Sequence, residues 1–297
     1  MINQAQMLAN RVRKNFRRLA PRFERRGIGA FRLYDRDIPE IRAAVDWYEG
    51  HLVVAEYARA QTDALPGWLE AMGSAVAGAL KVPADKVHLK KRRAGEQYEA
   101  RPAGERLAVR EAGLRFWVEL EGHIDTGLFI DHRETRALVR AGSAGKSFLN
   151  LFGYTGSFTC AAAAGGARET VTVDTSAAYL DWARDNLELN GLRGELVRAD
   201  ARGFLQTTSR RFDLCVLDPP SSSVRAGAEP LDIQRDHRAL IEAALAVLHP
   251  GGVLYFSTNH QRFEPRLEGL DAEEITARTV PEDFRNRTAH RCFRMKR

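Results

Sequence analysis

Apolar residues recur at helical spacing over the first 26 positions of the chain. These apolar residues predict a helix and are Met7, Leu8, Val12, Phe16, Leu19 and Phe23. Basic residues cover much of the remainder, and eight of them lie between positions 11 and 26. Because like charges three and four residues apart repel, so basic a helix indicates contact with an anion, and we favour RNA or DNA over a merely solvated face. The predicted RNA contacts on this helix are Arg11, Lys14, Arg17 and Arg18.

Short alternating runs follow this helix and predict a small, mostly β-rich domain. In chain order the predicted elements are strands over residues 28–34, 42–48 and 52–57, a helix over 65–80, a strand over 87–93 and a hairpin over 107–120. Glu49-Gly50 stands where a tight hairpin turn fits. The strand over 87–93 ends in four basic residues that we expect to hold phosphates, namely Lys90, Lys91, Arg92 and Arg93.

From about residue 146 the pattern changes to an apolar strand, a Gly-rich or acidic turn and a helix, repeated along the chain. The predicted strands cover residues 146–152, 170–173, 195–198, 212–217 and 253–256, and the predicted helices cover 159–164, 177–189 and 233–248. This order is typical of right-handed βαβ units, so the predicted fold class is α/β, a Rossmann-like sheet with helices on both faces, preceded by the small α+β domain. We expect three parts, residues 1–27, 28–122 and 123–297, and a mobile loop over 221–230.

Polar residues end four successive predicted strands, at the loop Gly153 to Gly156 and at Asp174, Asp200 and Asp218. Strand ends of this kind converge at one edge of a parallel sheet, where ligands bind. Each acid alone is compatible with a helix N-cap, but four such ends in succession favour a ligand site. The loop lacks the glycine pattern of dinucleotide sites and the Gly-Lys-Ser/Thr ending of nucleoside triphosphate sites. An acid after the second strand suits the two hydroxyls of a ribose.

Composition narrows the class of protein. The 297 residues suit two domains, and 44% hydrophobic with 28% charged residues is typical of a globular chain. The net charge of +6 favours polyanionic partners, and 38 of the 45 basic residues are arginine, which either phosphate binding or a GC-rich genome would explain. Three scattered cysteines predict neither a disulfide framework nor a metal site. No secretion signal or membrane span is predicted, so we expect a cytoplasmic protein.

The residues at these strand ends resemble those of the class I S-adenosylmethionine-dependent methyltransferases. The resemblance is carried by Asn150-Leu151-Phe152-Gly153-Tyr154-Thr155-Gly156-Ser157, Asp174, Asp200-Ala201 and Asp218-Pro219-Pro220-Ser221. It implies S-adenosylmethionine as cofactor, with the first loop at the methionine, Asp174 at the ribose, and Asp200 with Ala201 at the adenine. The cofactor-binding residues expected on this basis are Phe129, Asp131, Arg133, Asn150, Phe152, Gly153, Tyr154, Thr155, Gly156, Asp174, Thr175, Ser176, Asp200, Ala201 and Asp218.

A narrower resemblance extends over nearly all of residues 6–293. The segment around Asp131 resembles the Phe-x-Asp-x-Arg segment of ribosomal-RNA methyltransferases that carry an added β-rich domain. Five further segments are closely similar to the guanine-N7 half of a bifunctional 23S rRNA methyltransferase. They are Asn10-Arg11-Val12-Arg13-Lys14-Asn15, Tyr34-Asp35, Pro39-Glu40, Gln234-Arg235-Asp236-His237 and Phe284-Arg285-Asn286-Arg287. The resemblance implies 23S rRNA, or a precursor of the large subunit, as substrate. Since the bifunctional protein also has an N2-guanine half, a separate partner methyltransferase chain is a further expectation.

The expected chemistry can be compared with the residues that follow the strands. Methylation of a pyrimidine C5 needs a cysteine nucleophile, whereas Ser257-Thr258-Asn259 follows the fifth strand and Cys215 is predicted to be buried. Guanine N7 has a free lone pair and needs positioning only. The predicted catalytic residues are Asp218, Pro219, Pro220 and Asn259. In this hypothesis Asp218 and the Pro219 carbonyl accept from the guanine N1–H and amine, and Asn259 donates to O6.

Other interpretations stay open at this stage. Asn259 is equally compatible with a bond that ties the strand end to a loop. Methylation of an exocyclic amine or of cytosine C5, or a non-catalytic RNA-binding assembly role, would use the same fold. A guanine in a duplex would have to be flipped out to reach a sheet edge. The residues predicted to face the RNA there are Arg235, His237, Arg238, Arg285 and Arg287.

Overall fold

The computed structural model describes residues 2–57, 65–92, 104–122, 125–223, 231–284 and 289–297. Its contacts group the chain into two compact units. The first comprises residues 1–130 with 282–286, and the second comprises residues 131–281 with 287–297. The division into residues 1–27, 28–122 and 123–297 stays a prediction. Arg93, Arg285, Arg287 and most of the loop expected over 221–230 lie outside the described residues.

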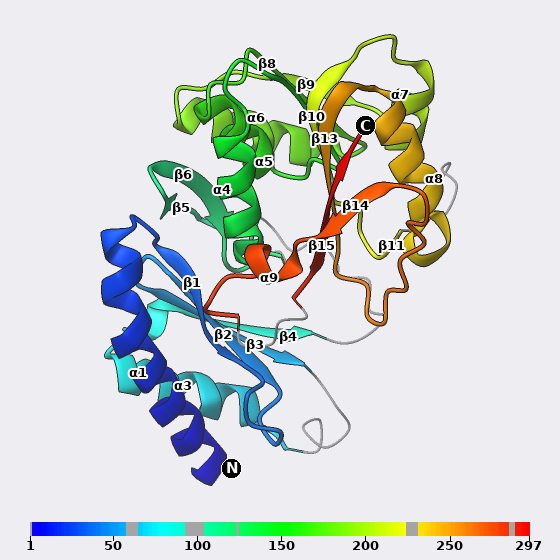
Figure 1. Cartoon of the computed structure of the whole chain (residues 1–297). Helices are drawn as coiled ribbons and strands as arrows, with labels where there is room; N and C mark the ends of the chain where they lie inside the picture. The colour runs from blue at the N-terminus through cyan, green and yellow to red at the C-terminus, as the bar shows by residue number, and fades with distance from the viewer. Residues whose placement is uncertain (1, 58–64, 93–103, 123–124, 224–230, 285–288) are drawn as a thin grey trace. The chain divides into compact units, whose positions relative to one another are not determined.

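The first unit contains two small sheets and two α-helices in its described part (Figure 1). Its elements are α1 (Ile2–Arg25), β1 (Ala30–Asp35), β2 (Ala43–Tyr48), β3 (His51–Tyr57), α3 (Trp68–Leu80), η1 (Ala84–Lys86), β4 (Val87–Arg92), β5 (Arg106–Glu111) and β6 (Leu114–Glu119). The four-stranded sheet has the order β1-β2-β3-β4, antiparallel except for the parallel pair β3 and β4. Strands β5 and β6 form a separate antiparallel hairpin. The predicted N-terminal helix and small α+β arrangement are confirmed.

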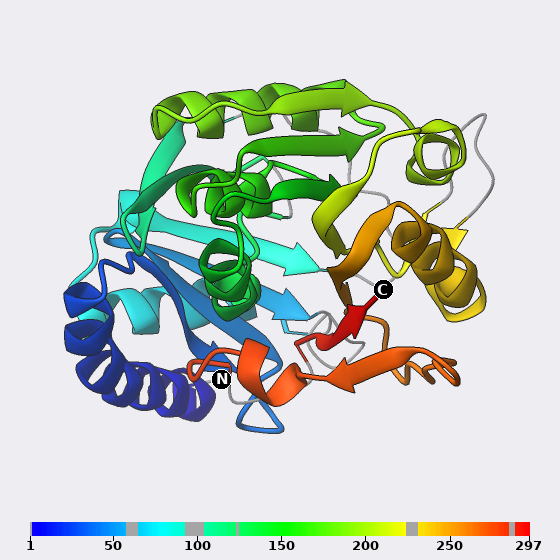
Figure 2. The same cartoon turned by 45° about the horizontal axis from the view of Figure 1, so that its top comes forward.

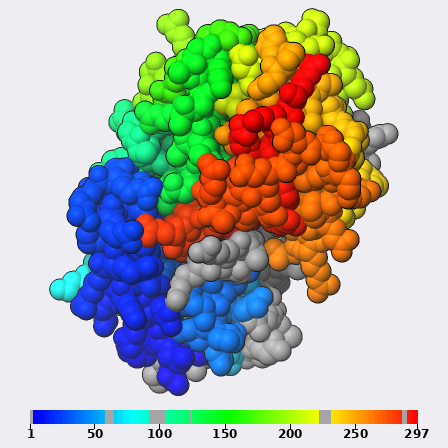
Figure 3. Space-filling model, viewed as in Figure 1, coloured from blue at the N-terminus to red at the C-terminus, as the bar shows by residue number. Residues whose placement is uncertain are grey.

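Helix α1 packs against the sheet of its unit through the predicted apolar stripe, except for Met7, which is 40% exposed. Leu8, Val12, Leu19 and Phe23 are fully or almost fully buried in one core with residues of β1, β2, β3 and α3. The Asn15 amide, also on this face, donates to the Leu33 carbonyl oxygen at 2.7 Å. The opposite face of the helix is polar and solvent-exposed, and its atoms are visible in blue in Figure 3.

The second unit is built on a seven-stranded sheet of order β14-β15-β13-β10-β7-β8-β9. Its elements are η2 (Ile130–His132), α4 (Arg133–Ala141), β7 (Ser147–Leu151), α5 (Ser157–Ala164), β8 (Glu169–Asp174), α6 (Ala177–Leu189), β9 (Glu195–Arg198), α7 (Ala201–Thr207), β10 (Phe212–Leu217), β11 (Ser222–Ser223), β12 (Leu231–Asp232), α8 (Ile233–Ala246), β13 (Leu248–Thr258), β14 (Asp271–Glu274), α9 (Thr276–Thr279) and β15 (Arg291–Lys296). The five central strands are parallel, and Figure 2 shows the green ones side by side with helices against them.

Alternation along each central strand builds a core on both faces of this sheet. Leu149 and Leu151 face a core shared with α7 and α8, whereas Phe148 faces a core shared with α4 and α5. On β10 the neighbouring residues Leu214 and Cys215 likewise face opposite sides of the sheet, and each packs into a different core. The predicted α/β class with helices on both faces is therefore confirmed.

The end of the sheet differs from the prediction in two respects. The last parallel strand, β13, begins at Leu248 rather than at residue 253, and α8 ends at Ala246. The register between β10 and β13 shifts between Phe212 and Leu214, so the Pro-Gly-Gly sequence forms a bulge within the strand instead of a loop before it. Strands β14 and β15 then add an antiparallel edge, which makes the sheet mixed rather than purely parallel.

A partly buried guanidinium, that of Arg32, joins the residues around 283 to the rest of the first unit. Arg32 forms two hydrogen bonds with the Asp46 carboxylate, at 2.8 and 3.0 Å, and its backbone N–H donates to Asp283 at 2.8 Å. Its guanidinium also lies 4.4 Å from the centre of the Phe284 ring. Burial by itself would lower the pKa of Arg32, but the charges of Asp46 and Asp35 raise it well above its ordinary value.

We expect Arg32→Met to reduce the free energy of unfolding by about 3 kcal/mol, because it leaves the Asp46 carboxylate buried without its cation. The measurement is the urea midpoint of unfolding followed by circular dichroism. The control is Arg25→Met, since Arg25 is exposed on α1 and its loss should change stability by no more than about 0.5 kcal/mol. Equal midpoints for the two variants would contradict the importance of this ion pair.

Candidate active site

The register of the parallel strands brings the predicted site residues to one edge of the sheet. Leu151 of β7 pairs with Val173 of β8 and with Leu217 of β10, and Leu217 pairs in turn with Phe256 of β13. The residue after each of these positions therefore lies in one row at the carboxyl ends of the strands. That row contains Phe152, Asp174, Asp218 and Ser257.

The loop after β7 has an alternating left-handed backbone. Phe152 has φ of 55°, Tyr154 of 48° and Gly156 of 73°. Such angles are uncommon for residues other than glycine and often mark functional loops. The loop turns tightly because the Gly156 N–H donates to the Gly153 carbonyl at 2.9 Å, and because Gly156 packs so close to Ala183 of α6 that a Cβ would lie 2.8 Å from the alanine Cβ. The backbone is thus presented at the sheet edge in a fixed shape.

Asp174 connects this loop to helix α6. One of its carboxylate oxygens accepts from the Tyr154 N–H at 3.0 Å and the other from the Ser176 N–H at 2.9 Å. Ser176 then caps α6 by accepting from Tyr179 N–H, and the Tyr179 ring packs edge-on against that of Tyr154. Each carboxylate oxygen has a second lone-pair site, so Asp174 can hold the loop and still accept from a ligand.

Two predicted cofactor contacts are buried beneath the loop. Asn150 is 1% exposed and its amide donates to the Thr159 hydroxyl at 3.0 Å, which is also hydrogen-bonded to Thr172. Thr155 is also 1% exposed, and its carbonyl accepts from the Asn186 amide at 2.8 Å. The structure gives the Asn150 side chain and the Thr155 carbonyl a role in supporting the loop.

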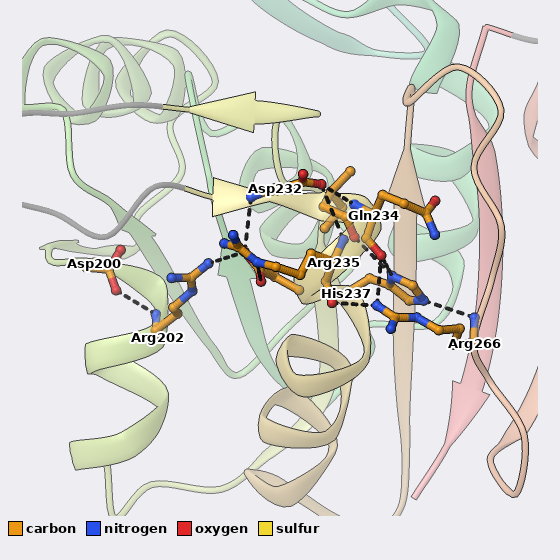
Figure 4. A network of polar contacts seen from close by, with 9 residues as sticks. Asp200, Arg202, Asp232, Gln234, Arg235, His237 and Arg266 are labelled. Carbon is orange, nitrogen blue, oxygen red and sulfur yellow. Dashed lines mark hydrogen bonds and ion pairs between the residues drawn. The ribbon is translucent and has the colours of Figure 1, made fainter.

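Asp200 lies at the end of β9 and caps helix α7 (Figure 4). Its Oδ1 accepts from the backbone N–H groups of Arg202 and Gly203 at 3.0 and 3.1 Å, which leaves Oδ2 for a ligand. Ala201 is buried at the first position of the helix. The N-cap interpretation of this acid is thereby confirmed, and the ligand contact stays a prediction for its other oxygen.

Asp218 is held by polar groups from two other elements. Its Oδ1 accepts from the Ser257 hydroxyl at 2.5 Å, and its Oδ2 lies 3.6 Å from Nε2 of His132. The side chain is 22% exposed, so one side of the carboxylate remains open. Pro219 is buried and Pro220 is exposed directly after it. The carboxylate is therefore accessible and oriented.

Asn259 is exposed at the end of β13. Its Oδ1 accepts from the Ser221 hydroxyl at 2.5 Å. This bond joins the strand end to the segment after Asp218, and it also orients the amide, since the Nδ2 donors must point away from Ser221. The loop-tying role and the donor role are compatible in this geometry.

The segment before α4 divides between the two units. Phe129 belongs to the first unit and is 39% exposed. Asp131 and Arg133 belong to the second unit, where Arg133 is buried and Asp131 accepts from Nδ1 of His290 at 3.1 Å.

One predicted RNA contact after Asp218 is wrong. His237 is fully buried, its Nε2 accepts from the Arg266 N–H at 2.9 Å, and its Nδ1 is 3.0 Å from the Ile233 carbonyl (Figure 4). Both ring nitrogens are used inside the protein, so the imidazole joins α8 to the segment after β13. Arg235 is exposed but pairs with Asp236 at 2.6 Å.

The basic residues of the first unit differ in their exposure. Lys14, Arg17 and Arg18 are exposed on α1, and Arg11 lies 3.4 Å from Asp37. Lys91 is exposed on β4, whereas Lys90 is 7% exposed, so its predicted direct contact with RNA is corrected. The physical reason is that neighbouring residues of a strand face opposite sides of the sheet. The side chain of Arg92 lies outside the described residues.

All three cysteines are buried, as predicted for Cys215. Burial raises the pKa of Cys160 to about 12, and it also raises the pKa values of Cys215 and Cys292 well above the ordinary value. Thiols in this state are poor nucleophiles, because the thiolate is the reactive form.

Sequence analysis missed three residues that contact the site. His132 was hidden inside the Asp131 to Arg133 segment, and His290 is distant in sequence. Ser257 was noted only because it is not a cysteine. The pairing of β13 with β10 was the signal available for Ser257, since it places Ser257 beside Asp218. No sequence signal joined His290 to the others.

We expect Gly153→Ala to destabilise the protein by about 1–3 kcal/mol, the usual result of overpacking. A Cβ at this position would lie 2.2 Å from Cγ2 of Thr172. Thr172→Ser removes that methyl but keeps the hydroxyl, so the double variant should regain part of the stability. The melting temperature is measured for the unchanged protein, Gly153→Ala and the double variant. Gly203→Ala is the control, because a Cβ at that position would meet nothing within 4 Å. If both alanine variants melt at the same temperature, the close packing beneath the loop is not important.

Comparison with known proteins agrees with this geometry. A family model described as S-adenosylmethionine-dependent methyltransferase matches residues 30–288. Ribosomal RNA large subunit methyltransferase K of Neisseria meningitidis serogroup B is 44% identical, over 97% of this chain and 86% of its own length. Ribosomal RNA large subunit methyltransferase K/L of Allochromatium vinosum is 46% identical over 97% of this chain, which spans only 42% of that protein.

Two solved structures share the fold. A methyltransferase crystallised with SAH (SMU.776) has a TM-score of 0.80 at 21% identity and covers all of this chain and 82% of its own. The S-adenosylmethionine-dependent methyltransferase of Agrobacterium tumefaciens has a TM-score of 0.64 at 18% identity and covers 86% of this chain and 87% of its own. With the matched family model and the 44% identical relative, these findings establish that the chain belongs to the S-adenosylmethionine-dependent methyltransferases.

Proposed function

We propose that this protein methylates guanine N7 in the RNA of the large ribosomal subunit, 23S rRNA or its assembly precursor. The observation that carries the proposal is the identity of 44% to a large-subunit methyltransferase K over 97% of this chain, a span that includes both units. The choice of N7 comes from the resemblance described above and from the chemistry of the site. Ribosomal RNA as substrate supports a cytoplasmic location, and a separate partner methyltransferase chain remains part of the proposal.

The residues at the sheet edge fit S-adenosylmethionine. The half-buried Asp174 carboxylate suits the ribose hydroxyls, and the rigid loop after β7 brings backbone to the same place. Asp200, with one oxygen left over from its capping role, is available to the adenosine half of the cofactor. When bound, the cofactor supplies an electrophilic methyl group on a positively charged sulfur.

The buried thiols argue against methylation of a pyrimidine C5. That reaction needs a cysteine thiolate that can attack the base, whereas Cys160, Cys215 and Cys292 are buried and their pKa values are raised. Guanine N7 attacks through its own lone pair and loses no proton. The protein then has to place N7 in line with the methyl group, roughly 3 Å from it.

Three groups at the site can place the base. Asp218 and the Pro219 carbonyl accept from the guanine N1–H and amine. Asn259, whose Oδ1 is occupied by Ser221, directs its Nδ2 donors outwards and can donate to O6. The negative charge of Asp218 also offsets the positive charge that develops on the purine as the methyl group transfers. This arrangement selects guanine among the four bases, because only guanine has two donors, N1–H and the amine, next to an acceptor, O6, that lies beside N7.

We expect Asp174→Ala to weaken the binding of S-adenosylmethionine by roughly 10- to 100-fold, the effect of losing hydrogen bonds to a charged group. Isothermal calorimetry measures the affinity. Asp181→Ala is the control, since Asp181 is an exposed acid on the adjacent α6 that pairs with Arg184. Comparable affinity for the two variants would remove Asp174 from the cofactor site.

Methyl transfer is tested with 23S rRNA from a strain that lacks the modification, followed by mass spectrometry of the nucleosides. We expect 7-methylguanosine, and we expect Asp218→Asn to lower the rate roughly 100-fold at saturating cofactor. Any other methylated nucleoside as the main product would overturn the proposal, and an unchanged rate in Asp218→Asn would overturn the assignment of Asp218.

Helix α1 is proposed to hold RNA phosphates. Lys14 lies three residues before Arg17 and four before Arg18, and all three side chains are exposed. We expect replacement of all three by Gln to weaken RNA binding and to reduce the slope of log K against log salt concentration by about 2 to 3. Filter binding at several salt concentrations measures this slope. Arg22→Gln should change it less because Arg22 pairs with Glu282 at 2.8 Å, and an equal change would contradict a specific role for the three exposed residues.

A further inference from the structure

Two histidines form a buried stack behind Asp218. His132 is 5% exposed and His290 is 1% exposed. Their ring centres are 4.1 Å apart and the planes are inclined by 16°. The Phe158 ring also packs against His132, with the two ring centres 5.6 Å apart and the planes inclined by 66°. Burial and stacking restrict the orientation of both imidazoles.

The neighbours of the stack decide where its protons lie. His290 Nδ1 is 3.1 Å from a carboxylate oxygen of Asp131, which is an acceptor, so this nitrogen carries a hydrogen. His132 Nε2 is 3.6 Å from Asp218 Oδ2 and 3.9 Å from Asp131 Oδ2. Its Nδ1 lies 3.4 Å from the Thr135 hydroxyl, which can donate to it. His132 is therefore arranged with its Nε2–H facing Asp218.

A divalent cation is a poor match for this cluster, although Asp131, His132 and His290 bring three ligand atoms within 4.8 Å of one another. A metal ion is bound by the lone pair in the plane of an imidazole ring. Two nearly parallel rings that are stacked 4.1 Å apart direct their lone pairs along separate planes, which do not converge on one ion. The arrangement instead suits hydrogen bonding to carboxylates.

We propose that His132 is a positioning residue for Asp218, held in place by His290, which Asp131 orients. It acts through its Nε2–H, which closes on Asp218 Oδ2 from the present 3.6 Å when a base binds on the other side of the carboxylate. Together with the Ser257 hydroxyl on Oδ1, it restrains the carboxylate from two sides. The proposal rests on the proposed function only in that Asp218 is the group that contacts the base.

The charge state of His132 explains why a histidine is useful here. Burial lowers the pKa of His132, and the neighbouring His290 and Arg136 lower it further. The charges of Asp218 and Asp131 oppose this change by raising the pKa, but they do not outweigh it. His132 is therefore neutral near pH 7, and it orients Asp218 without cancelling its negative charge. A permanent cation at this place would cancel the charge that has to face the methylated purine. Below pH 6.5, once His132 takes up a proton, we expect transfer to slow.

The coupling is tested first without any substrate, by following histidine ring signals in NMR spectra as the pH is changed. In Asp218→Asn the opposing charge of Asp218 is lost, so we expect the pKa of His132 to fall below its value in the unchanged protein. His237 is an internal control in the same spectra, because it is also buried with a lowered pKa but contacts Arg266 instead. An unchanged titration of His132 would overturn the proposal.

Kinetics then separate positioning from simple packing. His132→Phe keeps the stacked ring and loses the donor, whereas His132→Gln offers an N–H at the end of its side chain. We expect kcat in His132→Phe to fall roughly 10- to 100-fold, with KM for RNA and the affinity for S-adenosylmethionine changed by no more than about threefold. His132→Gln should recover most of kcat and lose the decline below pH 6.5. If kcat falls equally in both variants and still declines below pH 6.5, His132 serves only to pack the site and the proposal is wrong.

The two proposals fail in different ways. A main product other than 7-methylguanosine would overturn the proposed function, but the coupling of His132 to Asp218 would remain measurable by NMR. Conversely, formation of 7-methylguanosine by a protein in which His132 titrates independently of Asp218 would overturn only the role of His132.

Discussion

The register of the parallel strands is the constraint on which the site depends. Because Leu151, Val173 and Leu217 pair side by side, the residues that follow them meet at one edge of the sheet without further folding of the loops. A slip of one position in any strand would turn its apolar side chains from one face to the other and remove its polar end from the row. The two buried cores, one on each face, therefore fix the site as well as the fold.

The acids that follow strands β8, β9 and β10 can serve the structure and a ligand at once. Asp174 holds the loop after β7 and the start of α6, and Asp200 caps α7, yet both keep lone pairs for a ligand. Asp218 differs because its contacts are the side chains of Ser257 and His132 rather than backbone N–H groups. A carboxylate held by side chains from two other elements depends on tertiary structure more than one that caps the next helix, which suits a group that meets the substrate.

Helix α1 illustrates how packing and charge divide one element. Its apolar stripe is buried in the core of the first unit, and that burial holds in place a face carrying Lys14, Arg17 and Arg18. Isolated helices with so many like charges would be poorly stable, since neighbouring cations repel along the surface. The packed stripe offsets this repulsion and keeps the charges available for a polyanion.

The elements with a clear period, and the acids that follow them, could be predicted from the residues alone, because alternation and helical spacing are local properties of the chain. The helix at the N-terminus, the strands of the central sheet and the acids after them, Asp174, Asp200 and Asp218, follow from the sequence. It did not determine which basic residues are exposed, so Lys90 and His237 were assigned to RNA although they are buried. It also left open the bulge at the start of β13 and the antiparallel strand β15. Only the tertiary structure stacked His290 on His132 beside Asp218, because that contact joins residues far apart in the chain, and no local pattern records such a distance.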